Sequence, residues 1–510
     1  MIEPIPPGCD CPDSVEAIGR QIHQQVEQIT AWCQSCQTPF WDFEKELFAR
    51  VRMLGCLFVT LFLLARHQRL DLKAWLGGHR LVDAWAPRQL KTIYGTIRYA
   101  RAYLARRRGR GGFHPLDAIL GLTRDTFSPG VIALATRLTT RLSFKTAQLV
   151  LTAFWGWSPS TEALEHLVLG MGRVAPTYMS SAPPFPQEEG EMLVIEVDGK
   201  AAPMARPAEL LKRRGPRRHG QGCACGCQRH RGRARRQRRG PKKRRKKWAK
   251  DKNGRSATLV VMYTLRRGAD GLLHGPINKR VWGSFGQRKV MVQWARAEAT
   301  RRGFPPDTTK RIQILMDGEK CLALRLQELF PKALLTLDIR HVEEKLWLAG
   351  RAFHAEGSAE LAAWVEELRT LLYTQGGAAL VQGLRDRLAP VPVHGPGTKK
   401  KRQGLTKVIA YAEPRLGMMD YPQRLAEDLP VATGVVEGAV RHVVGERMDC
   451  GGMRWVVGKG EAMLRLRCIE VNGLWDHFFE WSQQHWREQL QHKEPVLIRT
   501  EQAISLPEAA

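Results

Sequence analysis

The chain has 510 residues, enough for two to four domains with cores of their own. Eighty Lys and Arg against fifty Asp and Glu give a formal net charge of +30, and a field of that sign attracts polyanions, nucleic acid first among them. The longest apolar run, Met53–Ala65, has thirteen residues. Because about twenty are needed to span a bilayer, this run predicts a buried helix and argues against a membrane partner.

The N-terminal residues have neither the basic start nor the apolar segment of a secretory signal. Eleven scattered cysteines, an odd number, are also unlike a disulfide framework. We therefore expect a reducing, cytoplasmic location.

Apolar residues at helical spacing predict helices over residues 13–70, within a helical N-terminal region spanning 1–89. The cysteines of this region could form a four-thiolate zinc site, since CxxC is a zinc spacing. The other interpretation, which the pattern favours, is four reduced cysteines at helix ends. The four are Cys9, Cys11, Cys33 and Cys36.

Residues 90–175 form the next predicted region. Alternating β-branched and aromatic residues over 90–105 predict a β-hairpin around Gly95. Residues 144–172 predict two helices joined by a short turn, with Ser160 capping the second. A helix-turn-helix that enters a DNA groove has this outline. Any pair of antiparallel helices has it too, and the pattern alone favours that plainer interpretation. Pro and Ser over 173–190 predict a linker and a domain boundary.

A dense basic insertion, 205–255, follows the first strand of the next region. From Arg206 to Arg255 there are 22 Lys and Arg against two acidic residues, so the segment cannot form a core by itself and is expected to contact DNA phosphates. The alternative is a solvated, flexible insertion. The residues expected to bind DNA are Arg213, Arg214, Arg217, Arg218, Arg235, Arg236, Lys242, Lys243, Arg244 and Arg245.

The same insertion contains a group of potential zinc ligands, Cys223, Cys225, Cys227 and His230. Zn²⁺ would organise the segment, but the CxCxCxxH spacing matches no common zinc finger. Both a zinc site and free thiols stay open on the sequence.

Strands and helices around and after the insertion predict a mixed α/β sheet over 191–341. Residues 342–430 are expected to be helical. Residues 431–490 complete the core with a helix that carries Glu437, and residues 491–510 form a tail.

Asp198 and Asp317 each follow an apolar strand and precede a glycine. Taken singly, each is better explained as a turn residue. Together they favour a shared site, because carboxylates at strand ends can converge in an α/β sheet. A third carboxylate on a helix packed against the sheet would complete a Mg²⁺ site, since Mg²⁺ prefers hard oxygen ligands.

Four stretches in this order, VIEVDGK, ILMDGEKCL, TLDIRHVEEKLW and GVVEGAVRHVVGERMDCGGMRW, resemble the core of bacterial insertion-sequence DDE transposases of the Mutator-like group. The resemblance covers roughly residues 90–480. It implies a ribonuclease-H-like mixed sheet with an all-helical insertion, preceded by a mostly helical N-terminal DNA-binding region. The CxCxCxxH segment departs from the group.

The resemblance also implies roles for single residues. Asp198, Asp317 and Glu437 match the catalytic triad that holds two Mg²⁺ ions, while Asp338 and His341 match a supporting C/D-x-x-H motif. His341 is expected to orient the site and not to bind metal.

Other polar residues lie close to these in the sequence. Arg441 and His442 follow Glu437 by one turn and could contact DNA phosphate. The nearby acids are expected to form salt bridges with the surrounding arginines. These acids are Glu196, Glu319 and Glu446.

The implied activity is hydrolysis of a phosphodiester at an element end, followed by transfer of the freed 3′-OH to target DNA. The implied partner is double-stranded DNA, both element ends and target, bound by a homo-oligomer. Three rival functions remain: a nucleic-acid-binding protein without catalysis, a Mg²⁺-dependent nuclease on the same fold, and a zinc-ribbon scaffold.

Overall fold

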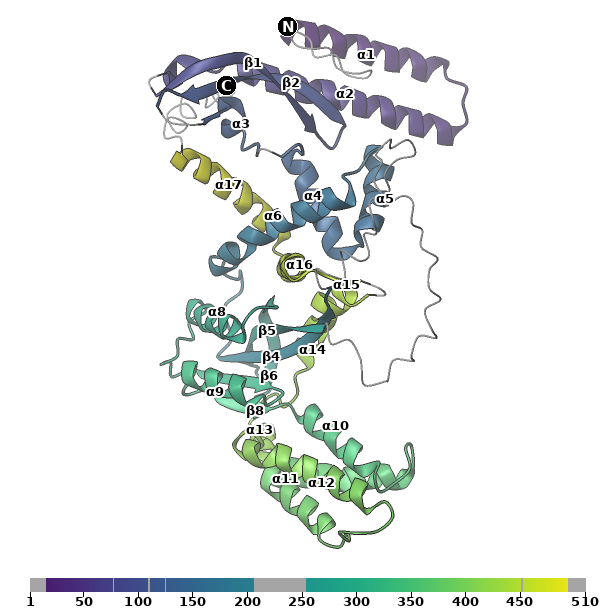
Figure 1. Cartoon of the computed structure of the whole chain (residues 1–510), viewed down its shortest axis with the longest axis vertical. Coiled ribbons are helices and arrows are strands. Elements are labelled where there is room, and N and C mark those ends of the chain that lie inside the picture. The colour runs from purple at the N-terminus through teal and green to yellow at the C-terminus, as the bar shows by residue number, and fades with distance from the viewer. Residues whose placement is uncertain are drawn as a thin grey trace, which may run out of the picture. The chain divides into compact units, whose positions relative to one another are not determined.

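The computed structural model describes residues 15–493 except 77, 109–110, 124, 206–253 and 451–452. It divides into two compact units, Met1–Met179 with Gly473–Ala510, and Ser180–Asn472 (Figure 1). The predicted DNA-binding residues of the basic insertion, its CxCxCxxH group, Cys9 and Cys11 all lie outside the described residues. Cys33 is exposed and Cys36 half-buried, and both are free thiols.

The first unit combines helices with a three-stranded sheet of order β1-β2-β3. Its elements are α1 (Val15–Ser35), α2 (Phe40–Gln68), the 3₁₀ turn Leu72–Trp75, β1 (His79–Lys91), β2 (Thr96–Arg106), β3 (Gly112–Phe113), α3 (Pro115–Ile119), α4 (Pro129–Arg141), α5 (Phe144–Trp155), α6 (Thr161–Ser180) and α17 (Trp475–Lys493).

Helix α2 differs from its prediction as a buried helix. It has 29 residues and is long and apolar enough by composition to cross a bilayer. Only 28% of its most apolar 18-residue stretch is buried. Phe58 and Phe62 are each 51% exposed. One such helix is weak evidence of a membrane.

The predicted hairpin and helical pair are both present. Strands β1 and β2 pair in antiparallel fashion around a turn at Thr92–Gly95, but β1 reaches back to His79, so the boundary expected at residue 89 falls inside a strand. Helices α5 and α6 flank a short turn, and the Ser160 hydroxyl accepts a hydrogen bond of 3.1 Å from the amide of Ala163, as predicted for a cap. The plainer interpretation of this pair, two antiparallel helices, stays open.

Two segments are arranged otherwise than expected. Helix α6 continues to Ser180, through part of the expected linker. Helix α17, expected to complete the α/β core, lies in the first unit, where the Tyr178 hydroxyl is 3.0 Å from Nδ1 of His477.

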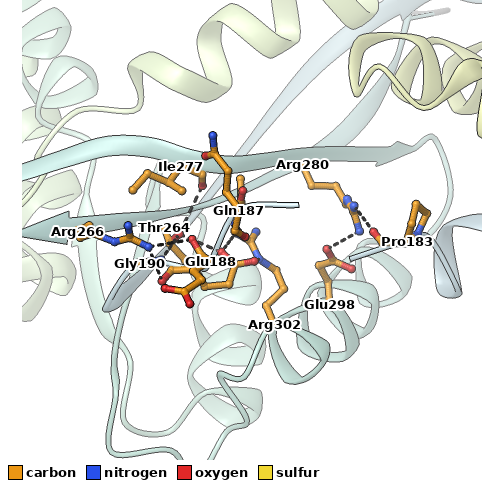
Figure 2. A network of polar contacts seen from close by, with 12 residues as sticks. Pro183, Gln187, Glu188, Gly190, Thr264, Arg266, Ile277, Arg280, Glu298 and Arg302 are labelled. Carbon is orange, nitrogen blue, oxygen red and sulfur yellow. Dashed lines mark hydrogen bonds and ion pairs between the residues drawn. The ribbon is translucent and has the colours of Figure 1, made fainter. Parts of the chain in front are cut away.

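The rest of the expected linker is tied to the second unit by charged groups (Figure 2). Arg302 donates two hydrogen bonds to the Glu189 carboxylate, of 2.8 and 2.7 Å, and Arg280 donates one of 2.8 Å to the carbonyl of Pro183. Arg280 also pairs with the buried Glu298 at 3.1 Å. This segment is therefore part of the folded unit and not a free linker, although the boundary between the two units does fall within 173–190, between Met179 and Ser180.

The second unit is built on a mixed five-stranded sheet of order β6-β5-β4-β7-β8. Strands β4, β5 and β6 are antiparallel neighbours, whereas β7 and β8 run parallel to β4. The strands are β4 (Met192–Pro203), β5 (Gly254–Arg267), β6 (Leu273–Ser284), β7 (Arg311–Met316) and β8 (Leu334–Leu337).

Helices cover both faces of this sheet (Figure 1). One face packs on α8, where the ring centres of Trp282 of β6 and Trp294 of α8 are 6.4 Å apart. The other packs on α14 and α16, where a Cβ at Gly283 would lie 3.7 Å from Leu464. The helices of this layer are α8 (Arg288–Arg301), α9 (Lys320–Leu329), α14 (Gly434–Val440), the π-helical turn Arg441–Gly445, α15 (Glu446–Met448) and α16 (Val457–Val471).

Between β8 and α14 the chain forms a helical insertion with a core of its own, in which Leu346, Leu361, Leu380 and Leu405 are fully or almost fully buried. Its elements are α10 (Ile339–Gly350), α11 (Ala359–Leu388), α12 (Thr398–Ala412), the 3₁₀ turn Glu413–Met418 and α13 (Tyr421–Ala426).

Candidate functional site

Three aspartates stand side by side at one edge of the sheet. Val197 of β4 pairs with Met316 of β7, and Met316 pairs with Leu337 of β8, all in parallel register. The residue after each of these three is an aspartate: Asp198, Asp317 and Asp338. This is the carboxyl edge of the parallel strands, where α/β sheets bind ligands.

The alternation of strand side chains assigns these residues to one face. Glu196 accepts a hydrogen bond from the amide of Val436 on α14, so it points to the α14 face of the sheet. Asp198, two residues later in the same strand, points the same way. Helix α14 carries Glu437, so the third residue of the predicted triad also lies over this face.

Asp198 is not a turn residue. Strand β4 continues through it to Pro203, and Asp198 pairs with Leu259 of β5. Its carboxylate is half-buried and accepts a 2.6 Å hydrogen bond from the amide of Gly199. Burial raises the pKa of Asp198 above its ordinary value, and the neighbouring Asp317 and Asp338 charges add to this, while the Gly199 amide and His341 oppose it.

Asp317 does lie in a turn, as its Asp-Gly sequence predicts. Its exposed carboxylate accepts a hydrogen bond of 3.1 Å from the amide of Glu319, and Gly318 has a φ of +76°, which favours glycine. The insertion holds this turn in place. Tyr411 donates to the carbonyl of Asp317 at 2.8 Å, and Arg415 donates to that of Gly318 at 2.7 Å.

Asp338 is a buried structural anchor. One carboxylate oxygen caps α10 by accepting from the amide of Arg340 at 3.0 Å, and the other accepts from the hydroxyl of Thr433. Nε2 of His341 lies 3.8 Å from that second oxygen, too far for a hydrogen bond. Asp338 thereby ties the start of the insertion to the residue that precedes α14.

Glu437 is exposed on α14 and forms an ion pair of 3.2 Å with Arg340. Both side chains are about half exposed, 44% for Glu437 and 58% for Arg340. Such a surface pair contributes about 1 kcal/mol or less, so little energy holds Glu437 in this orientation.

Glu196 is the residue that sequence reasoning misjudged. It was expected to bridge an arginine, yet it is fully buried and accepts 2.7 Å hydrogen bonds from the Tyr263 hydroxyl and the Val436 amide. Burial raises its pKa to about 7. Its carboxylate caps the first turn of α14 from the sheet and so fixes the helix that carries Glu437. The available signal was its position two residues before Asp198, on the same face.

Both remaining acids near the site are paired within the protein. Glu319 forms the predicted salt bridge, with Arg288. Glu446 lies 2.7 Å from Nδ1 of His442 and 3.6 Å from Arg467. Arg441 and His442 are exposed on the π-helical turn, so the predicted contact with DNA phosphate remains open.

Within the described residues, no group of three or more His, Cys, Asp or Glu side chains lies close enough to hold one metal ion. Asp198 and Asp317 come from neighbouring strands, whereas Glu437 is engaged by Arg340. The arrangement seen here thus offers two aspartates side by side, with the glutamate turned to another partner.

Comparisons with known proteins give little beyond this geometry. No protein-family model and no curated protein matches the chain. Among solved structures, the Drosophila P element transposase strand transfer complex is similar over 68% of this chain and 93% of that chain, at 10% identity and a TM-score of 0.28. At that TM-score the likeness supports no conclusion about fold or activity.

Proposed function

We propose that this protein is a DNA transposase whose second unit is a ribonuclease-H-like catalytic core. The observation that carries the proposal is the alignment of Asp198 and Asp317 at the carboxyl edge of parallel strands, with Glu437 on the helix that covers the same face. The sequence resemblance assigns catalytic roles to these same three residues. The mixed sheet interrupted by a helical insertion agrees with the architecture that the resemblance implies.

The donor set suits Mg²⁺, which prefers carboxylate oxygens and leaves positions open for phosphate oxygens. Asp198 and Asp317 would hold it, joined by Glu437 once its weak ion pair with Arg340 opens. Two bound Mg²⁺ ions would lower the pKa of the attacking water and stabilise the charge that develops on the transferred phosphate.

The protein's own residues would position this chemistry. Asp338 and Glu196 fix the two ends of the site, the first by joining α10 to Thr433 and the second by capping α14. Tyr411 and Arg415 hold the turn that presents Asp317. The first nucleophile is water and the second is the 3′-OH that hydrolysis releases, so no covalent protein intermediate is needed.

A cleavage-and-joining assay tests the proposal, with purified full-length protein, labelled DNA that carries the element's ends, and Mg²⁺. Wild type should nick and join, while Asp317→Ala should bind the same DNA but not react. Cleavage without joining would identify the protein as a nuclease. Binding without reaction by wild type would favour a nucleic-acid-binding protein without catalysis.

A further inference from the structure

A groove between helices α10 and α12 gathers positive charge on the helical insertion. Its volume is about 610 Å³, and the described residues that line it include no acid. Helix α10 contributes one cation and the residue that follows its end contributes another, while α12 contributes two that are seven residues apart and so share one face, which forms a wall. The cations are Lys345, Arg351, Lys400 and Lys407.

The floor of the groove is made by small residues. A Cβ added to Gly404 of α12 would lie 3.3 Å from Cα of Ala349 on α10, so the two helices are in close contact there. Long side chains rise on both sides, among them Leu348, which is 63% exposed. The result is an open channel with an apolar base and basic rims.

The lysines of the groove have no acidic partners in the described part of the chain. Within the described residues, no ion pair forms at Lys345, Lys400 or Lys407. Nζ of Lys345 lies 4.2 Å from the centre of the Tyr411 ring. Arg351 differs, because it pairs with Glu356 at 2.9 Å. Like charges gathered without counter-charges repel one another, and a polyanion in the groove would relieve that repulsion.

The groove leads to the candidate site. Tyr411 lines one end of it and donates its hydrogen bond to the carbonyl of Asp317. From Lys400 to Tyr411 the α12 wall is about 16 Å long, at 1.5 Å per helical residue. That length matches about five phosphates along one DNA strand, at 3.4 Å of helix axis for each.

We propose that this groove binds the phosphate backbone of the DNA that continues past Asp317, a contact separate from those expected of the basic insertion. The inference rests on the proposed function in taking DNA as the substrate. Nucleic acid fits better than an acidic peptide because Tyr411, which lines the groove, is hydrogen-bonded to the turn that carries Asp317, one of the carboxylates that would act on a phosphodiester. Lysine ammonium groups also bind phosphate as point charges, without needing a fixed geometry.

The test is the salt dependence of DNA binding by the full-length protein. Lys400→Gln and Lys407→Gln are combined, and the matched control combines Lys279→Gln and Lys289→Gln, two exposed lysines of the same unit that do not line the groove. Affinity for a labelled duplex is measured by anisotropy over a series of KCl concentrations with EDTA, so that cleavage plays no part. A parallel titration uses polyglutamate.

The groove variant should lower the magnitude of the slope of log K against log salt by about 2, since each lost phosphate contact removes about 0.9. The control should keep the wild-type slope, although its net charge falls equally. An unchanged slope in the groove variant would overturn the proposal. So would a loss confined to polyglutamate, which would make an acidic protein segment the occupant. A lowered slope in a protein that cleaves nothing would overturn the proposed activity alone.

Discussion

Replacing Glu196 by glutamine should change how stability depends on pH. The carboxyl group is fully buried between the Tyr263 hydroxyl and the Val436 amide. Glutamine has the same shape and is neutral at every pH. Its oxygen can accept from the Val436 amide, and its amide can donate to the Tyr263 oxygen.

The magnitude follows from the pKa, which burial raises from 4.5 to about 7. The folded state then binds the proton more tightly than the unfolded chain, so the free energy of unfolding falls as pH rises from about 4.5 to about 7. At 1.36 kcal/mol for each pKa unit, the loss is about 3 kcal/mol above pH 7. It is absent below the unfolded pKa, where both states are protonated.

Urea unfolding at a series of pH values, with a chelator present, measures this effect. Relative to wild type, Glu196→Gln should gain about 3 kcal/mol between pH 4.5 and pH 8. Glu191→Gln, an exposed position just before the same strand, should show no such trend. If the difference between wild type and Glu196→Gln stays constant across this range, Glu196 is not the buried, proton-binding cap described here.

Three further results are expected. Glu298→Gln should lower the free energy of unfolding by about 3 kcal/mol, because it removes the negative charge that pairs with the buried Arg280. Glu413→Gln, which alters an exposed ion pair, should lower it by less than about 1 kcal/mol, and chemical denaturation compares the two variants. Gly318→Ala should lower the free energy of unfolding by about 1–3 kcal/mol, because the φ of Gly318 is positive and an added Cβ would lie 2.5 Å from Cδ1 of Leu337. In the same measurement, the control Gly458→Ala in helix α16 should be neutral or stabilising. At ten times its Kd, Mg²⁺ should stabilise the wild-type protein by about 1.4 kcal/mol, which is measured as a rise in melting temperature. If Mg²⁺ raises the melting temperature of wild type no more than that of Asp198→Asn, the proposed ion site is wrong.

The sheet could be predicted from sequence because its strands carry their own signal. The segments Leu193–Val197 and Ile312–Met316 are buried on both faces and are apolar except for one polar residue each, and buried strands appear as mostly hydrophobic segments. The same signal marks where β7 and β8 end, which is why the aspartates after them could be singled out. The extension of β4 beyond Asp198 carried no such mark, since Gly199, Lys200 and Ala201 are not an apolar run.

The face on which Glu196 lies could be predicted, but its hydrogen-bond partners could not, because they are distant in the chain. Tyr263 is 67 residues away and Val436 is 240 residues away. An acid beside a basic segment is most simply expected to meet an arginine, and only the packing of α14 on the sheet removes that option. The placement of helix α17 in the first unit depends in the same way on contacts that no local pattern encodes.

The difference between Glu196 and Asp198 decides which of the two can act at the sheet edge. They share a strand and a face, but Glu196 has both oxygens occupied and no exposure, so it cannot reach a substrate without releasing α14. Asp198 is half-buried, and within the described residues its carboxylate accepts one hydrogen bond, from the amide of Gly199, which leaves its second oxygen for another group. Burial is the first cause of its raised pKa, and the excess negative charge of the neighbouring Asp317 and Asp338 adds to it. A cation at this edge would offset that excess, whereas a phosphate arriving alone would add to it.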